Sequence, residues 1–209
     1  MEQWIDEKGL GLPRPVLLTV FTVSGICALL YQLIWQRALL LIYGSNIESV
    51  TMVVSAFMLG LGLGSLVGGA ISKRPGVPLL FLFGCVEILI GVYGAFSLRL
   101  FEFIGDLTGA GSTLSTGILC FLLVLVPTLL MGSTLPLLVA HYVNASGNVG
   151  YSVSMLYFVN TLGAGLGAFL AAFVILGSLG LQGSVLLAVC LNLFAGVTIL
   201  FFWWKGARS

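Results

Sequence analysis

Charged side chains are scarce in this sequence, and their scarcity decides the solvent in which the chain folds. Only 7% of its 209 residues are Asp, Glu, Lys or Arg, whereas 59% are hydrophobic, and the mean hydropathy is +1.18. A soluble globule of this size needs many more ionic groups to cover its surface. The composition therefore argues against a soluble protein and predicts one that lies in a bilayer.

Two further absences exclude other classes of function. The chain has only eight basic residues, which are widely scattered, and a net charge of +1, so we expect no nucleic-acid partner. The cysteines lie apart in apolar runs and lack CxxC or Cys/His spacing, which argues against a disulfide framework and a zinc site. They are Cys27, Cys85, Cys120 and Cys190. We interpret them as small packing residues, and we expect neither a metal nor a cofactor.

Apolar runs long enough to cross a bilayer occur six times. A helix needs about 20 residues to span ~30 Å of hydrocarbon. The six runs cover residues 15–43, 48–72, 77–104, 114–142, 150–178 and 181–204. The sequence therefore predicts an all-α integral membrane domain over residues 15–204, between tails 1–14 and 205–209. Because residues 1–14 do not resemble a cleaved signal peptide, we expect the first span to remain as an anchor.

The basic residues indicate how the spans are oriented. If the N-terminus is cytoplasmic, the inner segments hold six basic residues: Lys8, Arg14, Lys73, Arg74, Lys205 and Arg208. The outer side then keeps only Arg37 and Arg99. This distribution fits the excess of Lys and Arg in cytoplasmic loops. We therefore expect both termini in the cytoplasm. Because the segments between spans are short, the function should lie in the helices or in something they hold.

The second half of the chain repeats the first. LGLGLGSLVGGA from Leu59 matches LGAGLGAFLAAF from Leu162 at an offset of 103 residues. FGCVEILIGVYG and AVCLNLFAGVTI match at an offset of 105, which aligns Glu87 with Asn192. Since three crossings reverse direction, the second copy would be inverted in the membrane. We therefore predict a 3+3 inverted repeat, although glycine-rich apolar helices can also resemble one another by chance.

Glycines recur along one face of the second and fifth spans. They are Gly60, Gly64 and Gly68 in one, and Gly163 and Gly167 in the other, followed by Ala171. A spacing of four residues makes a smooth stripe on which another helix can pack closely. We expect the second and fifth spans to cross at Gly64 and Gly167. A dinucleotide-binding motif would need a preceding strand, which the sequence does not offer.

Three polar residues lie at similar depth inside their spans. Glu87 is the only acid well inside a span, and Asn160 and Asn192 fall near the same level. A charge at the bilayer centre costs at least ~2.5 kcal/mol, so each such group needs a partner, water or a neutralising proton. One interpretation is a proton or substrate site. The other, which we favour, is a protonated Glu87 that is hydrogen-bonded to an asparagine and fixes the helix register.

The first span ends in polar and aromatic residues. Tyr31 and Gln32 share a helix face with Ser24 and Trp35, so this face should turn toward neighbouring helices. With Glu87, Asn160 and Asn192, Tyr31 and Gln32 complete our candidate intramembrane site. Arg37 points elsewhere, and we expect it to pair with Glu48 at the membrane surface.

Four motifs, in order, resemble one family. SGxxALLYQxxWxR from Ser24, AFMLGLGLGS from Ala56, PTLLMGSTLPLL from Pro127 and LYFVNTLGAGLGAFLAAFVILGSLGLQGS from Leu156 are similar to the membrane part of spermidine synthase-like transmembrane proteins, also called fused major-facilitator/spermidine synthase proteins. The resemblance implies a six-helix unit like half of a major-facilitator fold. The family usually has a glutamate where this chain has Gln32, which puts a charge-dependent role for the first helix in doubt.

The resemblance implies two hypotheses for function. Family members typically carry an aminopropyltransferase-like domain after the last helix, whereas this chain stops at Ser209 with no catalytic residue of that domain. We therefore do not expect an enzyme. The leading hypothesis is a membrane subunit or scaffold, surrounded by lipid, that docks a separate synthase-like protein or a larger complex. The alternative is a small transporter, proton-coupled or not, that works as a homodimer. Under either hypothesis, we expect the protein in the inner (cytoplasmic) membrane of a prokaryote.

Overall fold

Helices account for all the regular structure of the described chain. The computed structural model describes residues 11–43, 46–108, 113–206 and 208. In order, its elements are α2 (Arg14–Tyr43), α3 (Asn46–Ser72), α4 (Leu79–Thr108), α5 (Thr113–Ser146), α6 (Val149–Leu170), the π-helix η1 (Ala171–Ile175) and α7 (Leu176–Gly206). The all-α prediction is confirmed for these residues. The tail predicted over residues 1–14 lies mostly outside them.

Five helical segments are long and apolar enough to cross a membrane. They cover Arg14–Leu41, Val50–Ser72, Leu79–Leu107, Gly117–Ser146 and Val149–Gly206. The first four correspond to the first four predicted spans, with limits that differ by a few residues. The predicted fifth and sixth spans fall together in the last segment, which is 58 residues long. The described chain is thus a helical membrane protein.

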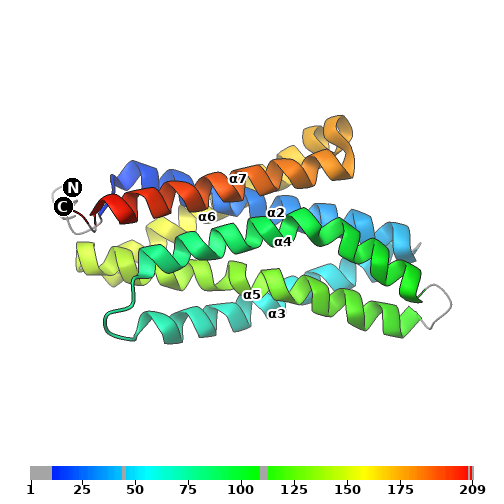
Figure 1. Cartoon of the computed structure of the whole chain (residues 1–209), viewed down its shortest axis with the longest axis horizontal. Helices are drawn as coiled ribbons and strands as arrows, with labels where there is room; N and C mark the ends of the chain where they lie inside the picture. The colour runs from blue at the N-terminus through cyan, green and yellow to red at the C-terminus, as the bar shows by residue number, and fades with distance from the viewer. Residues whose placement is uncertain (1–10, 44–45, 109–112, 207, 209) are drawn as a thin grey trace.

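The last segment is broken at Gly180. This residue has φ 63° and ψ −172°, a backbone conformation that costs a residue with a side chain much more than it costs glycine. The hydroxyl of Ser184 donates to the Gly180 carbonyl at 2.5 Å and so satisfies a group that the break exposes. Figure 1 shows the chain turning back here, so that α6 begins and α7 ends at the same end of the bundle.

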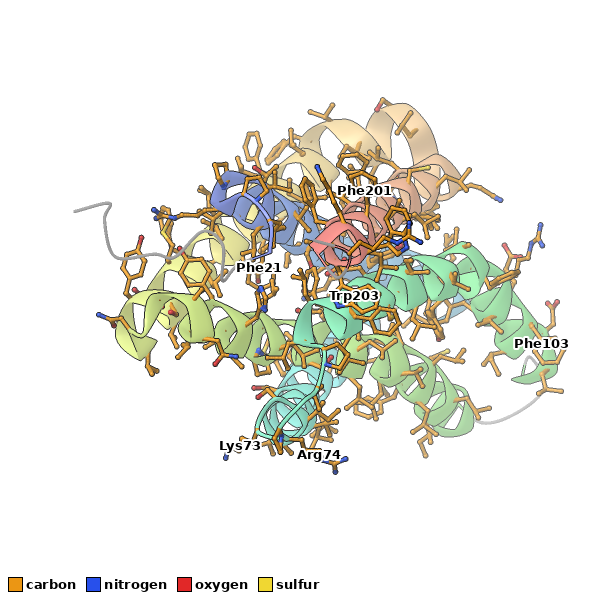
Figure 2. The ribbon with its side chains drawn as sticks, turned by 60° about the vertical axis from the view of Figure 1, so that its left-hand side comes forward. Phe21, Lys73, Arg74, Phe103, Phe201 and Trp203 are labelled. Carbon is orange, nitrogen blue, oxygen red and sulfur yellow. The ribbon has the colours of Figure 1, made fainter. Side chains whose placement is uncertain are left out.

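Basic residues gather at that same end. In Figure 1, α2 begins there, α3 ends there and α7 ends there. These helix ends carry Arg14, Lys73, Arg74, Lys205 and Arg208, and we call this the basic end. Figure 2 shows Lys73 and Arg74 side by side where α3 finishes. The opposite end, where α2 finishes, is called the far end below.

The glycine stripes pack against different helices from those predicted. A Cβ at Gly64 would overlap the Leu129 carbonyl oxygen of α5, whereas one at Gly167 would overlap the Ile26 carbonyl oxygen of α2. Gly60 and Gly68 likewise face α5, and Gly163 faces α2. The expected crossing of the second span with the fifth is therefore wrong. Spacing shows which face of a helix is smooth but not which neighbour covers it.

Three helix pairs form the framework of the bundle. α3 packs mainly on α5, α6 on α2, and α4 on α7. Buried apolar side chains lie in two clusters, one around Trp35 and one around Phe21 and Phe83 nearer the basic end. Large apolar side chains such as Leu66 and Phe173 are more than 70% exposed. An apolar exterior of this kind is what a bilayer requires.

Candidate functional site

Glu87 lies in the centre of the bundle and has two hydrogen-bond partners. Its side chain is fully buried. The Ser24 hydroxyl donates to Glu87 Oε1 at 2.6 Å, and Asn192 Nδ2 donates to Glu87 Oε2 at 2.6 Å. Both carboxyl oxygens therefore accept a bond from an uncharged group. The predicted meeting of Glu87 with an asparagine is seen, and that asparagine is Asn192.

These two bonds join three helices. Ser24 belongs to α2, Glu87 to α4 and Asn192 to α7, so one carboxyl group fixes the depth of three spans relative to one another. Close packing allows this arrangement. A Cβ at Gly91, one turn along α4, would meet the Leu193 side chain and the Asn192 Cβ at 3.2–3.4 Å. The small residue lets α7 approach α4 closely enough for the Asn192 amide to reach the carboxyl group.

A cavity adjoins this polar centre. Its volume is ≈ 190 Å³, and side chains from α2, α3, α4, α5, α6 and α7 all line it. The polar residues in its wall are Ser24, Thr134, Asn160, Thr161 and Asn192. A cavity that large exceeds the space of one water molecule several-fold. The centre of the bundle is thus both hydrogen-bonded and partly hollow.

Asn160 and Asn192 approach this cavity from opposite helices. Asn160 Nδ2 donates to the Phe21 carbonyl oxygen at 3.2 Å, so α6 is tied to α2 here. Asn192 Oδ1 is buried and has no hydrogen-bond partner. An unpaired buried acceptor costs about 1–3 kcal/mol. The structure therefore brings together three of the five predicted site residues, namely Glu87, Asn160 and Asn192.

Tyr31 and Gln32 belong elsewhere. Tyr31 is fully buried and stacks on Trp35, with ring centroids 5.0 Å apart. The Trp35 Nε1 donates to Ser97 Oγ at 3.0 Å, which joins α2 to α4 in the half nearer the far end. Gln32 is half-buried, and neither it nor Tyr31 lines the cavity. Of the predicted polar face, Ser24 thus reaches the candidate site, whereas Tyr31 and Gln32 do not.

The predicted ion pair between Arg37 and Glu48 concerns a side chain outside the described part of the structure. Arg37 itself is exposed near the end of α2. The pairing stays a prediction, because the Glu48 side chain is not described.

Three polar residues of the site were not in the prediction. Ser24 was placed on the polar face of its helix but not next to Glu87, and Thr134 and Thr161 were not considered. Hydroxyl groups are common in membrane helices, because they can bond to their own backbone, so their presence alone signals little. Depth would have identified Ser24, since it lies about as many residues from the start of α2 as Glu87 lies from the start of α4.

The fold and the buried polar centre define a helical membrane protein with an internal polar site. Comparison of the chain with protein-family models, curated protein sequences and solved structures finds no match.

Proposed function

We propose that this chain is the membrane subunit, or scaffold, of a larger assembly, and that it crosses the bilayer six times. A straight α-helix as long as the 58-residue segment Val149–Gly206 would measure about 87 Å, nearly three times the hydrocarbon thickness. The reversal at Gly180 divides it into two arms that can each span the membrane. Six crossings bring both termini to the basic end, which would be cytoplasmic.

An inverted 3+3 repeat, like half of a major-facilitator fold, is supported by how the helices pair. If α2, α3 and α4 correspond to α5, α6 and α7, the packing of α3 on α5 has its counterpart in the packing of α6 on α2. Likewise α2 packs on α7 as α5 packs on α4, and α4 and α7 pack on each other. The larger helix contacts thus each have a counterpart under the same exchange, as a pseudo-two-fold axis in the membrane plane requires, whereas the smaller contact of α2 with α4 has no comparable one between α5 and α7.

Individual residues support the same axis. Gly25 of α2 lies against Ala164 of α6, and Gly132 of α5 lies against Leu61 of α3. Leu61 and Ala164 are equivalent positions of the repeat, because they are 103 residues apart, so the two contacts correspond to each other. Glu87 and Asn192, aligned at an offset of 105 in the sequence, bond directly to each other. Two equivalent residues can touch in an antiparallel pair only where they lie on the symmetry axis. The polar centre would therefore lie on the pseudo-two-fold axis.

The subunit role rests on one observation, which is that Glu87 has a hydrogen-bond donor on each of its oxygens. A carboxyl group held in this way fixes helices in place, as a structural group does. The helices are joined by short connections, so chemistry would come from a protein that docks on them. Exposed Lys73, Arg74, Lys205 and Arg208 at the basic end offer a positively charged surface for such a partner.

Affinity purification tests the subunit role. The tagged chain is solubilised from its native membrane in a gentle detergent, and the proteins that accompany it are identified by mass spectrometry. A variant with Lys73 and Arg74 changed to Gln serves as the matched control. We expect a stoichiometric partner, either a synthase-like protein or a multi-subunit complex, that the variant retains less well. A chain that purifies alone, at the size of a monomer or homodimer, would contradict the proposal.

The cavity favours one alternative, a small transporter that works as a homodimer. A site lined by all six helices near the pseudo-two-fold axis is where carriers of this architecture bind their substrates. In that case Glu87→Gln should fold normally but abolish proton-coupled uptake into proteoliposomes, because an amide cannot release a proton in the working range. Uptake by the unmodified chain, lost in this variant, would replace the subunit role with transport.

A further inference from the structure

A second pocket lies at the far end of the bundle. In Figure 1, α2 and α4 finish toward this end, and the chain turns back there between α6 and α7. The pocket has a volume of ≈ 360 Å³, and α2, α4 and α7 each contribute to its wall. It shares no residue with the central cavity, so the two are separate. Its volume falls within the range of sites that bind small organic molecules.

Helix periodicity and the break at Gly180 bring this wall together. Leu181 and Gln182 are the first residues after the break, so the reversal of the chain carries them to the pocket. The α4 residues of the wall lie on one face of that helix, because they are spaced i, i+3, i+4, i+7 and i+8. They are Leu98, Phe101, Glu102, Gly105 and Asp106.

The wall combines apolar side chains with negative charge. Its polar side chains are those of Glu102, Asp106 and Gln182. No lysine, arginine or histidine lines the pocket. The apolar side chains of the wall are those of Ala38, Leu41, Leu98, Phe101 and Leu181. A pocket of this composition favours a ligand that has both an apolar body and a positive charge.

The two carboxylates of the wall lack a partner that would stabilise them. Glu102 and Asp106 lie one turn apart in the last two turns of α4, which ends at Thr108. Like charges at i and i+4 repel each other, and the negative end of the helix dipole adds to the cost. Within the described part of the chain, no hydrogen bond or ion pair joins either carboxylate to another residue. A local arrangement that costs free energy without an evident compensation is typical of a functional site.

The donor set favours an organic cation over a metal ion. Among the described residues, no group of three His, Cys, Asp or Glu side chains is placed to hold a metal ion. A hard cation such as Ca²⁺ takes about 6–8 oxygen ligands, which a mostly apolar wall does not supply.

We infer that the far-end pocket binds an organic cation, an ammonium group attached to an apolar body, whose charge faces Glu102 and Asp106 while its body covers the apolar wall. Such a group can come from a soluble amine or from a lipid headgroup. The inference goes beyond the subunit role and does not rest on it. Its failure would therefore leave the partner purification unaffected.

Cyclohexylammonium is the probe for the experiment. The purified full chain is incubated in an uncharged detergent with radiolabelled cyclohexylammonium, and bound label is measured against unlabelled competitors at equal ionic strength. We expect saturable binding. Methylammonium lacks the apolar body and cyclohexanol lacks the charge, so each should compete at least about tenfold more weakly than cyclohexylammonium itself. Equal competition by either compound, equal displacement by calcium, or a lack of saturable binding would each overturn the inference.

Lipid added to the micelles distinguishes the two sources of the ammonium group. The measurement is repeated with phosphatidylethanolamine, which has an ammonium headgroup, and with phosphatidylglycerol, which has none. Unchanged binding in both assigns the pocket to a soluble amine. Competition by phosphatidylethanolamine alone assigns it to a lipid headgroup. Both outcomes support the ammonium group as the ligand, whereas competition by phosphatidylglycerol alone would contradict it.

Variants of exposed residues locate the binding in the pocket. Glu102→Gln and Asp106→Asn keep the size of each side chain and should each weaken binding at least about tenfold. Arg99→Gln is their control, because Arg99 is exposed on the same helix but does not line the pocket. Unchanged binding in both acid variants would overturn the inference. If one of them does not fold, the other decides.

The apolar part of the wall has its own matched pair. Leu41 is 75% exposed and lines the pocket, whereas Leu107 is 66% exposed and does not. Leu41→Ala should weaken cyclohexylammonium binding several-fold, because it removes apolar surface that the ligand covers. Leu107→Ala should leave binding unchanged. Equal effects of the two substitutions would place the apolar body outside this pocket and contradict the inference.

Discussion

At the scale of single residues, the buried polar groups of this bundle differ in their effect on packing. Glu87 joins α2, α4 and α7 through Ser24 and Asn192, whereas the Tyr31 hydroxyl is buried without any partner. A satisfied polar group specifies one arrangement of helices, while an unsatisfied one only costs free energy. These two residues should therefore respond in opposite ways to the loss of their polar atoms.

Replacement of Glu87 tests the first of these effects. Glu87→Gln keeps the size of the side chain: its amide oxygen can accept from the Ser24 hydroxyl, and its amide nitrogen can donate to Asn192 when the Asn192 amide turns to present its oxygen, so we expect little change in thermal stability. Glu87→Leu leaves both partners unpaired and should lower the free energy of unfolding by about 1–3 kcal/mol for each. Thermal unfolding in detergent compares the two variants. Equal stability of Glu87→Leu and the unmodified chain would contradict a structural role for the carboxyl group.

Tyr31→Phe should leave the protein as stable as before or make it more stable. The change removes a hydroxyl that lies against Gly94 without a hydrogen bond, and it keeps the ring that stacks on Trp35. Trp35→Phe is the comparison, since it removes the bond to Ser97 and should be destabilising by about 1 kcal/mol or more. The same unfolding measurement ranks them. A clear loss of stability in Tyr31→Phe would mean that the hydroxyl has a partner in solution.

At the scale of helices, small residues determine which neighbours can meet. Gly64 and Gly167 lie in direct contact with the backbone of α5 and α2, but Gly62 and Gly165, on the same two helices, have no atom within 4 Å of an added Cβ. The sequence LGLGLG thus contains glycines of two kinds, some facing a neighbouring helix and others facing outward. Only the first kind is needed for packing.

Substitution by leucine should distinguish the two kinds of glycine. We expect Gly64→Leu and Gly167→Leu to lower stability by a few kcal/mol or to prevent assembly, because the new side chain would overlap a backbone carbonyl. Gly62→Leu and Gly165→Leu, the matched controls, should be neutral or slightly stabilising, since leucine has the better helix propensity. Size-exclusion profiles and thermal unfolding provide the readout. Similar behaviour of all four variants would contradict the packing of α3 on α5 and of α6 on α2.

Sequence alone predicted the all-α class and the first four spans well, but it predicted the neighbours of the helices poorly. Long apolar runs determine where a membrane helix begins and ends, and residue depth correctly brought Glu87 and Asn192 to one level. Which helices pack on each other depends on tertiary packing, which the sequence of a single helix does not encode. The helix predicted to pack on Gly64 was therefore wrong. Ser24 was missed for a related reason, because a hydroxyl group often bonds within its own helix.

At the scale of the whole molecule, the distribution of basic residues determines the expected orientation. Arg14, Lys73, Arg74, Lys205 and Arg208 lie at one end, and only Arg37 and Arg99 lie in the other half of the described bundle. The positive-inside bias then predicts that the basic end faces the cytoplasm.

Single-cysteine labelling tests this orientation. On a background without the four native cysteines, a cysteine at position 75, in the exposed connection between α3 and α4, should be reached only by a membrane-permeant reagent in intact cells. A cysteine in the connection between α4 and α5 is the control for the opposite side of the membrane, and an impermeant reagent should label it. Labelling of position 75 by an impermeant reagent would reverse the proposed topology.

The exchange of partners between the two halves has a consequence for biosynthesis. The surface of α3 that carries Gly64 is covered by α5, and the surface of α2 that contacts Gly167 is covered by α6. Neither surface can therefore be buried by the other helices of the first half of the chain. As the ribosome extends the protein, the first three helices enter the membrane with those surfaces still uncovered. These surfaces contact lipid or an insertion factor until the helices that begin at residue 113 and beyond have been synthesised. The two halves of the bundle therefore become native together, and neither is a completed unit before the other arrives.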